Sequence, residues 1–188
     1  AEYFATFPWI GRHATKEKLF WADGCENLHI ATHGAFDLKG ETDAIYSSCL
    51  IFAGVKKWML NLPNSSKYGN GIVTADEISR LNLRSTKLVV LSSCLNGRSD
   101  MIISKGFQGM VGAFAAAGVK FVIAHLWNAP ESIGTVILMD TFYYCYVNLK
   151  MDPPLALAKA KKYLKNLTIA EMRERGWFDY IRSCHLDR

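Results

Sequence analysis

One run of branched apolar residues, KLVVLSSC at 87–94, constrains the fold more than any other feature of this sequence. Its centre, LVVL, contains no polar residue, whereas a strand with one face in water alternates apolar and polar residues. Such a run is typical of a parallel strand that is buried on both faces under helices. We therefore predict an α/β fold with a mostly parallel central sheet flanked by helices.

The rest of the chain alternates between short dense apolar runs and longer amphipathic runs, as strands and helices do in this class. Further strands are predicted at 27–34 (NLHIATHG), at 48–54 (SCLIFAG, on the side of a hairpin) and at 119–127 (VKFVIAHLW). Helices are predicted over 15–22, 74–81, 104–117, 132–148, 153–166 and 168–175. Capping boxes are predicted at the starts of the second and last of these helices, and the Asn, Ser, Pro and Gly residues of 60–71 predict a surface loop.

Composition limits the classes to which this chain can belong. With 188 residues, of which 50% are hydrophobic and 21% charged, it can bury one substantial core, so we predict a single domain over residues 1–188. The first residue is not methionine, which suggests a domain excised or processed from a longer chain. The net charge of +5 is scattered except at Lys159–Lys165, which we interpret as the solvated face of a helix. No direct nucleic-acid partner is therefore expected.

The sequence also argues against a membrane or secreted protein. No apolar run reaches the ~18 residues needed to cross a bilayer, and the N-terminus lacks the pattern of a signal peptide. The five cysteines lack metal-type or disulfide-framework spacing, which favours reduced thiols and a cytoplasmic location. Four of them are interpreted as small buried apolar residues: Cys25, Cys49, Cys145 and Cys184.

The remaining cysteine ends a predicted strand, where chemistry is expected. In a parallel sheet the carboxyl ends of the strands lie along one edge, and ligands bind at that edge. His33 ends one strand, and Cys94 ends another after enough chain for a hairpin, a loop and a helix between them. If these strands are neighbours, about 4.8 Å apart, the imidazole and the thiol face one cleft. The imidazole can then activate the thiol as a nucleophile, and the amides of Gly34 and Cys94 can hold the oxyanion of a tetrahedral intermediate.

Two further histidines allow other interpretations. His29 and His33 are four residues apart in one strand, about 13 Å, which is too far to share a zinc ion, so no metal site is predicted. His29 is expected to be a packed or hydrogen-bonded core residue, and His125 either lines the cleft or closes its floor. The chain has no glycine-rich phosphate loop after its first strand, which excludes a nucleotide-binding doubly wound domain, and no cofactor is predicted.

Three motifs in a fixed order carry a resemblance to a known family: HIATHGAFD, LVVLSSCLNG and GMVGAFAAAGVKFVIAHLWN. From about residue 15 to residue 175 the chain resembles the CHAT domain, a caspase-like cysteine peptidase module of the clan of caspases, separase and gingipain. The resemblance implies a three-layer caspase-like sandwich and a thiol protease with His33 as the catalytic histidine and Cys94 as the nucleophile. It implies peptide-bond cleavage without metal, a histidine that protonates the leaving amine, and tetratricopeptide repeat (TPR) or other regulatory modules on the same or a partner chain.

The chain departs from the family pattern on both sides of Cys94 and after Trp127. Ser93 replaces a usual alanine, and Leu-Asn-Gly replaces the acidic run that follows the cysteine. After Trp127, Asn-Ala-Pro-Glu replaces a valine and paired aspartates, in a loop that helps form the pocket for the residue before the cut. Trp127, Asn128 and Glu131 are therefore the candidate pocket residues. Glu131 either favours a basic substrate residue or lies in the first turn of the next helix, where the dipole favours its charge.

Two functions from different classes follow from these residues. The first is a regulated endopeptidase, in which Cys94 attacks a protein or peptide substrate and His33 serves the leaving nitrogen. The second is a catalytically silent CHAT fold kept for docking to partners. The presence of both groups favours the first, because a silent module has no physical need for them.

Overall fold

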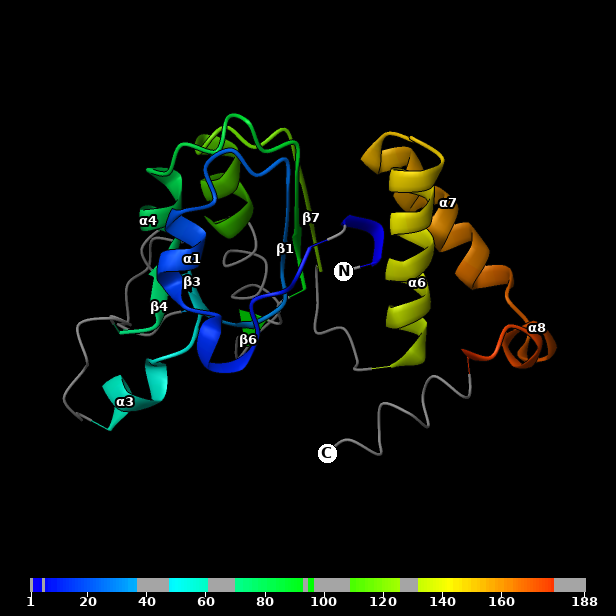
Figure 1. Cartoon of the computed structure of the whole chain (residues 1–188), viewed down its shortest axis with the longest axis horizontal. Helices are drawn as coiled ribbons and strands as arrows, with labels where there is room; N and C mark the ends of the chain where they lie inside the picture. The colour runs from blue at the N-terminus through cyan, green and yellow to red at the C-terminus, as the bar shows by residue number, and fades with distance from the viewer. Residues whose placement is uncertain are drawn as a thin grey trace. The chain divides into compact units, whose positions relative to one another are not determined.

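The computed structural model describes residues 2–4, 6–36, 48–60, 70–92, 95–96, 109–125 and 132–177 (Figure 1). Contacts divide the chain into two compact units. The sheet unit is Pro8–Ala129, and the helical unit combines Ala1–Phe7 with Pro130–Arg188. Within the described ranges, every strand belongs to the sheet unit.

The strands of the sheet unit form two hydrogen-bonded groups. Three strands are parallel, with β5 in the centre: β1 (Asn27–Ile30), β5 (Leu88–Leu91) and β7 (Phe121–Ala124). The second group has the order β4 (Ile72–Thr74), β3 (Ser48–Ile51), β2 (His33–Phe36) and β6 (Leu95–Asn96). In it, β2 is parallel to β6, while β3 is antiparallel to both β2 and β4, as predicted for a strand on the side of a hairpin.

The central strand β5 is buried at all four of its positions, which confirms what its unbroken apolar sequence predicts. The predicted strand at 27–34, in contrast, is two strands rather than one. A bend at Thr32 separates β1 from β2, and the Thr32 hydroxyl donates to the carbonyl oxygen of Ile51 in β3. The chain therefore leaves one strand group and joins the other at this threonine.

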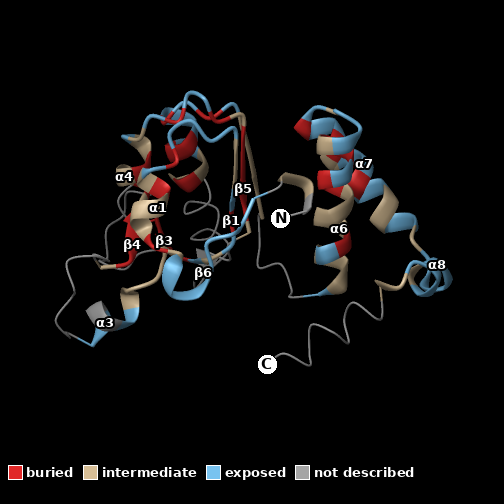
Figure 2. Ribbon diagram, viewed as in Figure 1, coloured by how far each residue is buried: buried red, intermediate tan, exposed pale blue. Residues whose placement is uncertain are grey.

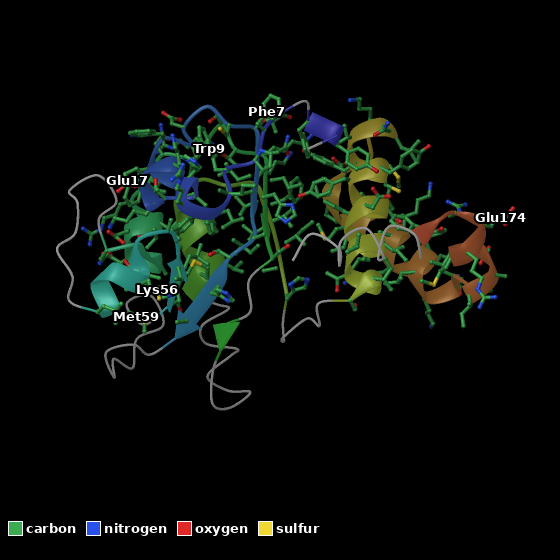
Figure 3. The ribbon with its side chains drawn as sticks, turned by 60° about the horizontal axis from the view of Figure 1, so that its bottom comes forward. Phe7, Trp9, Glu17, Lys56, Met59 and Glu174 are labelled. Carbon is green, nitrogen blue, oxygen red and sulfur yellow. The ribbon has the colours of Figure 1, made fainter. Side chains whose placement is uncertain are left out.

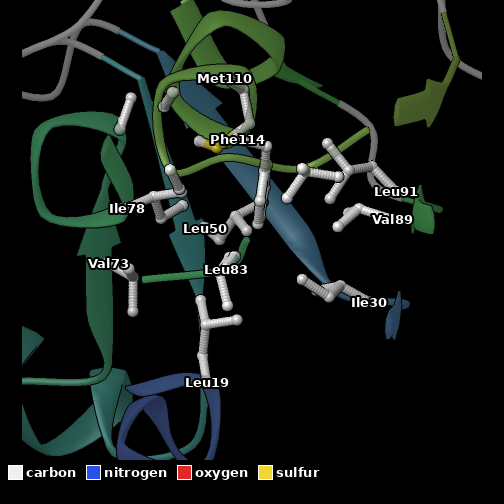
Figure 4. Close-up of a cluster of buried hydrophobic side chains, with 14 of the residues drawn as sticks. Leu19, Ile30, Leu50, Val73, Ile78, Leu83, Val89, Leu91, Met110 and Phe114 are labelled. Carbon is white, nitrogen blue, oxygen red and sulfur yellow. The ribbon is translucent and has the colours of Figure 1, made fainter. Parts of the chain in front are cut away.

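Helices pack on the parallel strands through one cluster of buried side chains (Figure 4). They are α1 (Lys16–Phe20), α4 (Ala75–Ser79) and a helix over 109–116. Leu19, Ile78 and Phe114, one from each helix, belong to the same cluster as Val89 and Leu91 of β5. Full burial of such a side chain contributes about 1.5–3 kcal/mol, so this cluster is a main source of stability for the sheet unit. The fold is thus the predicted α/β class, with a parallel sheet flanked by helices as a caspase-like sandwich requires.

The ends of two helices follow the local signals in the sequence. Glu77 N donates to Thr74 Oγ1 at 3.1 Å and Thr74 N donates to Glu77 Oε2 at 2.9 Å, which confirms the capping box of α4. Gly118, with a φ of +100°, follows the helix over 109–116 as predicted. The helix α4 ends at Ser79, two residues before the predicted end, because the backbone turns tightly from Ile78 to Leu81.

Four short elements of the sheet unit were not expected from the sequence. They are the 3₁₀ turn η2 (Gly11–His13), the helix α3 (Val55–Met59) and the strands β4 and β6. Most of the predicted loop at 60–71 and the first part of the helix predicted at 104–117 lie outside the described residues.

The helical unit consists of a short 3₁₀ turn and a series of helices. Its elements are η1 (Glu2–Phe4), α6 (Ile133–Tyr143), the π-helical turn η3 (Tyr144–Asn148), α7 (Pro153–Asn166) and α8 (Ile169–Glu174). Buried residues of α6, η3 and α7 are shown in red in Figure 2, and they include Phe142, Cys145 and Ala160. The capping box predicted for α8 is present, with Thr168 N donating to Glu171 Oε2 at 2.8 Å. No helix in the described part of the chain is long and apolar enough to cross a membrane.

Candidate functional site

His33, the predicted catalytic histidine, is the first residue of β2, and its side chain is exposed. Its backbone pairs with Ile51 of the antiparallel neighbour β3. The next residue, Gly34, is buried and pairs with Leu50 on one side and Leu95 on the other. The backbone that carries the imidazole is therefore held by strands on both sides, while the imidazole itself reaches solvent.

Cys94, the predicted nucleophile, lies outside the described residues, but the strand pairings before and after it are described. β1 pairs with β5, and β2 pairs with β6. In both pairings, the two residues that lie opposite each other differ in residue number by the same amount, as Gly34 and Leu95 do. The same difference separates His33 from Cys94 in the sequence. The condition that the strands at 27–34 and 87–94 are neighbours is met by the pairing of β1 with β5, but His33 begins β2 rather than ending a strand as predicted. The roles of His33, Gly34 and Cys94 stay predictions.

A second group of polar side chains lies at the carboxyl ends of the parallel strands. His29 Nε2 of β1 is 3.0 Å from Ser92 Oγ, which directly follows β5. The backbone of Ser92 is held as well, because its N–H donates to the carbonyl oxygen of Ile30 at 2.9 Å. His29 is hydrogen-bonded as predicted, but it is exposed, so the prediction of a core position was wrong. Ser92 was not identified from the sequence, although it lies within the strand predicted at 87–94, two residues before Cys94.

The third histidine of the sheet unit, His125, directly follows β7 and is partly buried. Its Nδ1 atom is buried without a hydrogen-bond partner in the described part of the chain. Desolvation lowers the pKa of His125 below its ordinary value of 6.5. Desolvation also lowers the pKa of His29, and the charge that His125 would carry lowers it further. Both imidazoles are therefore neutral at pH 7.

The other cysteines differ in exposure. Cys49 and Cys145 are each 2% exposed, which confirms their interpretation as buried apolar residues. Desolvation raises the pKa of the Cys49 thiol, which keeps it protonated and unreactive. Cys25 is exposed, so its predicted burial was wrong, because it lies in the turn before β1 rather than in a strand or helix. Cys184 lies outside the described residues.

The predicted pocket residues Trp127, Asn128 and Glu131 also lie outside the described residues. In the ranges that the structure describes, no three His, Cys, Asp or Glu side chains lie close enough together to hold a metal ion. The helical unit contains a shallow hollow of about 430 Å³, lined by Lys159, Lys162, Tyr163, Asn166, Leu167 and Glu171. Two of the lysines interpreted as a solvated helix face therefore border this hollow.

The surface of the sheet unit carries an exposed cation–π group near its N-terminal end. Lys18 Nζ lies 3.8 Å from the ring centre of Trp9 and 4.9 Å from that of Trp21. Both indoles are exposed, and Figure 3 labels Trp9. Contacts of this kind at an exposed site contribute about 0.5–1 kcal/mol, so they order the side chains locally rather than hold the fold together.

The ordered motifs and the parallel strand pairing agree with a comparison to known families, in which a family model for the CHAT domain matches residues 7–178. The chain belongs to the CHAT domain family. CHAT domains are related to caspase-like cysteine peptidases. A search of curated proteins and a search of solved structures each return no match to this CHAT domain.

Proposed function

We propose that this CHAT domain is a cysteine endopeptidase that cleaves a protein or peptide substrate. The observation that carries the proposal is the strand register. The difference in residue number between paired residues is the same in the β1–β5 pairing, which precedes His33 and Cys94, and in the β2–β6 pairing, which pairs Gly34 with Leu95. Neighbouring strands of a sheet are about 4.8 Å apart, a distance that suits an imidazole and a thiol acting on one scissile bond. Membership of the CHAT family supports the same chemistry.

In the proposed mechanism, Cys94 acts as the nucleophile and His33 transfers protons. The thiol proton passes to His33, and the thiolate sulfur attacks the scissile carbonyl carbon to form a C–S bond. The π electrons of the carbonyl move to its oxygen, and the amides of Gly34 and Cys94 hold that oxyanion. His33 then protonates the leaving nitrogen as the C–N bond breaks and a thioester forms. Water adds to the thioester with His33 as the base, and the sulfur recovers its proton as the acid product leaves.

The proposal extends to the surroundings in which the domain works. TPR or other regulatory modules, on the same or a partner chain, are proposed to control access to the cleft, as the family implies. The residues proposed to contact the substrate residue before the cut are Trp127, Asn128 and Glu131, with Glu131 favouring a basic side chain. A cytoplasmic location is proposed because Cys25, Cys49 and Cys145 are free thiols.

A silent interaction module is the second candidate, and specific sequence departures favour it. Leu-Asn-Gly follows Cys94 in place of an acidic run, and the paired aspartates after Trp127 are missing. In such a module the thiol of Cys94 would have no activating group. It would react like an ordinary exposed cysteine, whose pKa is about 8.5.

Thiol alkylation separates the two candidates, with Cys25 as an internal reference. Cys25 is exposed and lies outside the strands, so it reports the reactivity of an ordinary thiol in the same molecule. We expect limiting iodoacetamide to modify Cys94 at least about tenfold faster than Cys25, as measured by peptide mass spectrometry, because activated cysteines have a larger thiolate fraction at pH 7. His33→Ala is expected to bring the Cys94:Cys25 ratio close to one.

A Cys94:Cys25 ratio near one in the wild type, unchanged in His33→Ala, would overturn the peptidase proposal.

A peptide library incubated with the domain and its partner modules gives the second measurement. Cleavage that is lost in Cys94→Ala supports an endopeptidase, and enrichment of Arg or Lys before the cut supports the role of Glu131.

A further inference from the structure

We propose that His29 and Ser92 form a positioning pair that holds the chain leading into Cys94. The inference rests on the proposed function and adds two residues that its chemistry does not use. The hydrogen bond between His29 Nε2 and Ser92 Oγ, 3.0 Å long, joins β1 to the residue after β5. Ser92 is two residues before Cys94 in the sequence, so the bond acts on the chain directly before the proposed nucleophile.

The sheet geometry explains why these two side chains meet. Successive side chains of a strand point to opposite faces of a sheet. Leu91 and Ile30 both belong to the buried cluster, so the residues next to them, Ser92 and His29, point to the opposite face. β1 and β5 pair in parallel with Ile30 opposite Leu91, which brings Ser92 and His29 to the same end of that face.

His125 completes this face at the end of the third parallel strand. Ala124 packs against the buried cluster and pairs with Leu91, so His125 lies on the same face as Ser92. The charge that His125 would carry also lowers the pKa of His29, after the larger effect of desolvation. Since both rings are neutral at pH 7, His29 can bond the Ser92 hydroxyl as donor or acceptor according to its tautomer.

The bond is better suited to positioning than to stabilising the fold. The bond lies in an exposed position, and an exposed neutral hydrogen bond adds little net stability. Ser92, however, is fixed twice, through its side chain to His29 and through its N–H to the carbonyl oxygen of Ile30. Small displacements of a nucleophile reduce its rate strongly, with a 1 Å error able to cost about a hundredfold. Loss of the bond should therefore lower the reactivity of Cys94 much more than it lowers stability.

The test measures the Cys94:Cys25 iodoacetamide ratio in variants of the whole 188-residue chain. We expect Ser92→Ala and His29→Ala each to lower the ratio about fivefold to tenfold, and the double variant to lower it no further, because both remove one interaction. Ser92→Thr keeps the hydroxyl and should stay within about twofold of the wild type.

Ser85→Ala is the matched control. Ser85 Oγ accepts a hydrogen bond of 3.1 Å from Gly24 N, which is an exposed bond like that of Ser92, and Ser85 lies before β5 rather than after it. The Cys94:Cys25 ratio of Ser85→Ala should equal that of the wild type. The melting temperature of Ser85→Ala should match that of Ser92→Ala.

Three results would overturn the positioning role. They are a Ser92→Ala ratio equal to that of the wild type, losses in Ser92→Ala and His29→Ala that multiply in the double variant, and a Ser92→Thr ratio as low as that of Ser92→Ala. If the wild-type ratio itself is near one and insensitive to His33→Ala, the proposed function fails and the positioning role fails with it. A high wild-type ratio that Ser92→Ala leaves unchanged refutes the positioning role alone.

Discussion

Replacing Gly71 with alanine tests how tightly the strand group that includes His33 is held at its far edge. Gly71 precedes β4, has a φ of +68°, and accepts a backbone hydrogen bond of 2.6 Å from Phe52 N. A Cβ added there would lie 2.8 Å from Phe52 O, 2.9 Å from Ala53 O and closest of all to Val55 N, at 2.4 Å. All three are backbone atoms, so no side-chain rotation can relieve the contacts.

The expected loss of stability has three sources. A left-handed φ costs a residue other than glycine roughly 1–2 kcal/mol. Weakening the hydrogen bond between Phe52 and Gly71 costs about 0.5–1.5 kcal/mol. Relieving the contacts requires backbone shifts like those in overpacked cores, which cost about 1–3 kcal/mol. Gly71→Ala should therefore lower the free energy of unfolding by about 3–6 kcal/mol, a large part of the ~5–15 kcal/mol of a typical domain.

Thermal and urea unfolding followed by tryptophan fluorescence measures this loss. At about 2–4 °C per kcal/mol for a chain of this size, the melting temperature should fall by at least about 6 °C. The matched control is Gly112→Ala in the helix over 109–116, where an added Cβ meets no atom within 4 Å. That change should raise stability by about 0.5–1 kcal/mol, since alanine favours a helix. The reasoning is refuted if Gly71→Ala stays within the ~0.5 kcal/mol typical of surface changes, or if both variants shift alike.

Three further predictions concern the core, a helix cap and pH. Phe114→Ala empties a site that is 0% exposed and should cost about 3–5 kcal/mol, and an unchanged urea midpoint would contradict it. Thr74→Ala removes the cap hydroxyl of α4 and should cost about 1 kcal/mol in thermal melts, more than Thr168→Ala in the exposed box of α8. The folded state lowers the pKa of His125, so the unfolded chain binds more protons and stability falls as pH drops below 6.5. His125→Gln should reduce this fall of the unfolding free energy with pH, measured by urea titrations from pH 7 to 5. An equal fall in the variant and the wild type would contradict the prediction.

Several features of the fold could be predicted because they depend on neighbouring residues. The unbroken apolar run of β5 indicates burial on both faces, since any solvent-facing position would favour a polar residue. The spacing of Thr74 and Glu77 predicts a cap, because the two side chains satisfy amides within a single turn. The order of the three motifs indicates the CHAT family, because the motifs are read directly from the sequence.

Other features could not be predicted because they depend on what packs against a residue. The exposure of His29 and Cys25 depends on which elements cover the strand and the turn that carry them, and a local pattern contains no such information. The division of residues 27–34 into β1 and β2 falls at Thr32, whose hydroxyl donates to the carbonyl oxygen of Ile51 in another strand. The helix α3 and the π-helical turn after α6 are short, and short elements give weak periodic signals.

The sequence by itself determined the α/β class, two helix caps, the family motifs and the candidate pair of His33 and Cys94. Only the tertiary structure decided the register, with Gly34 opposite Leu95, and the contact of His29 with Ser92. The physical reason is that side chains repeat every two residues along a strand, so a slip of two residues leaves every apolar side chain on its own face. Hydrogen bonds between distant strands remove that ambiguity, and they form only when the chain has folded.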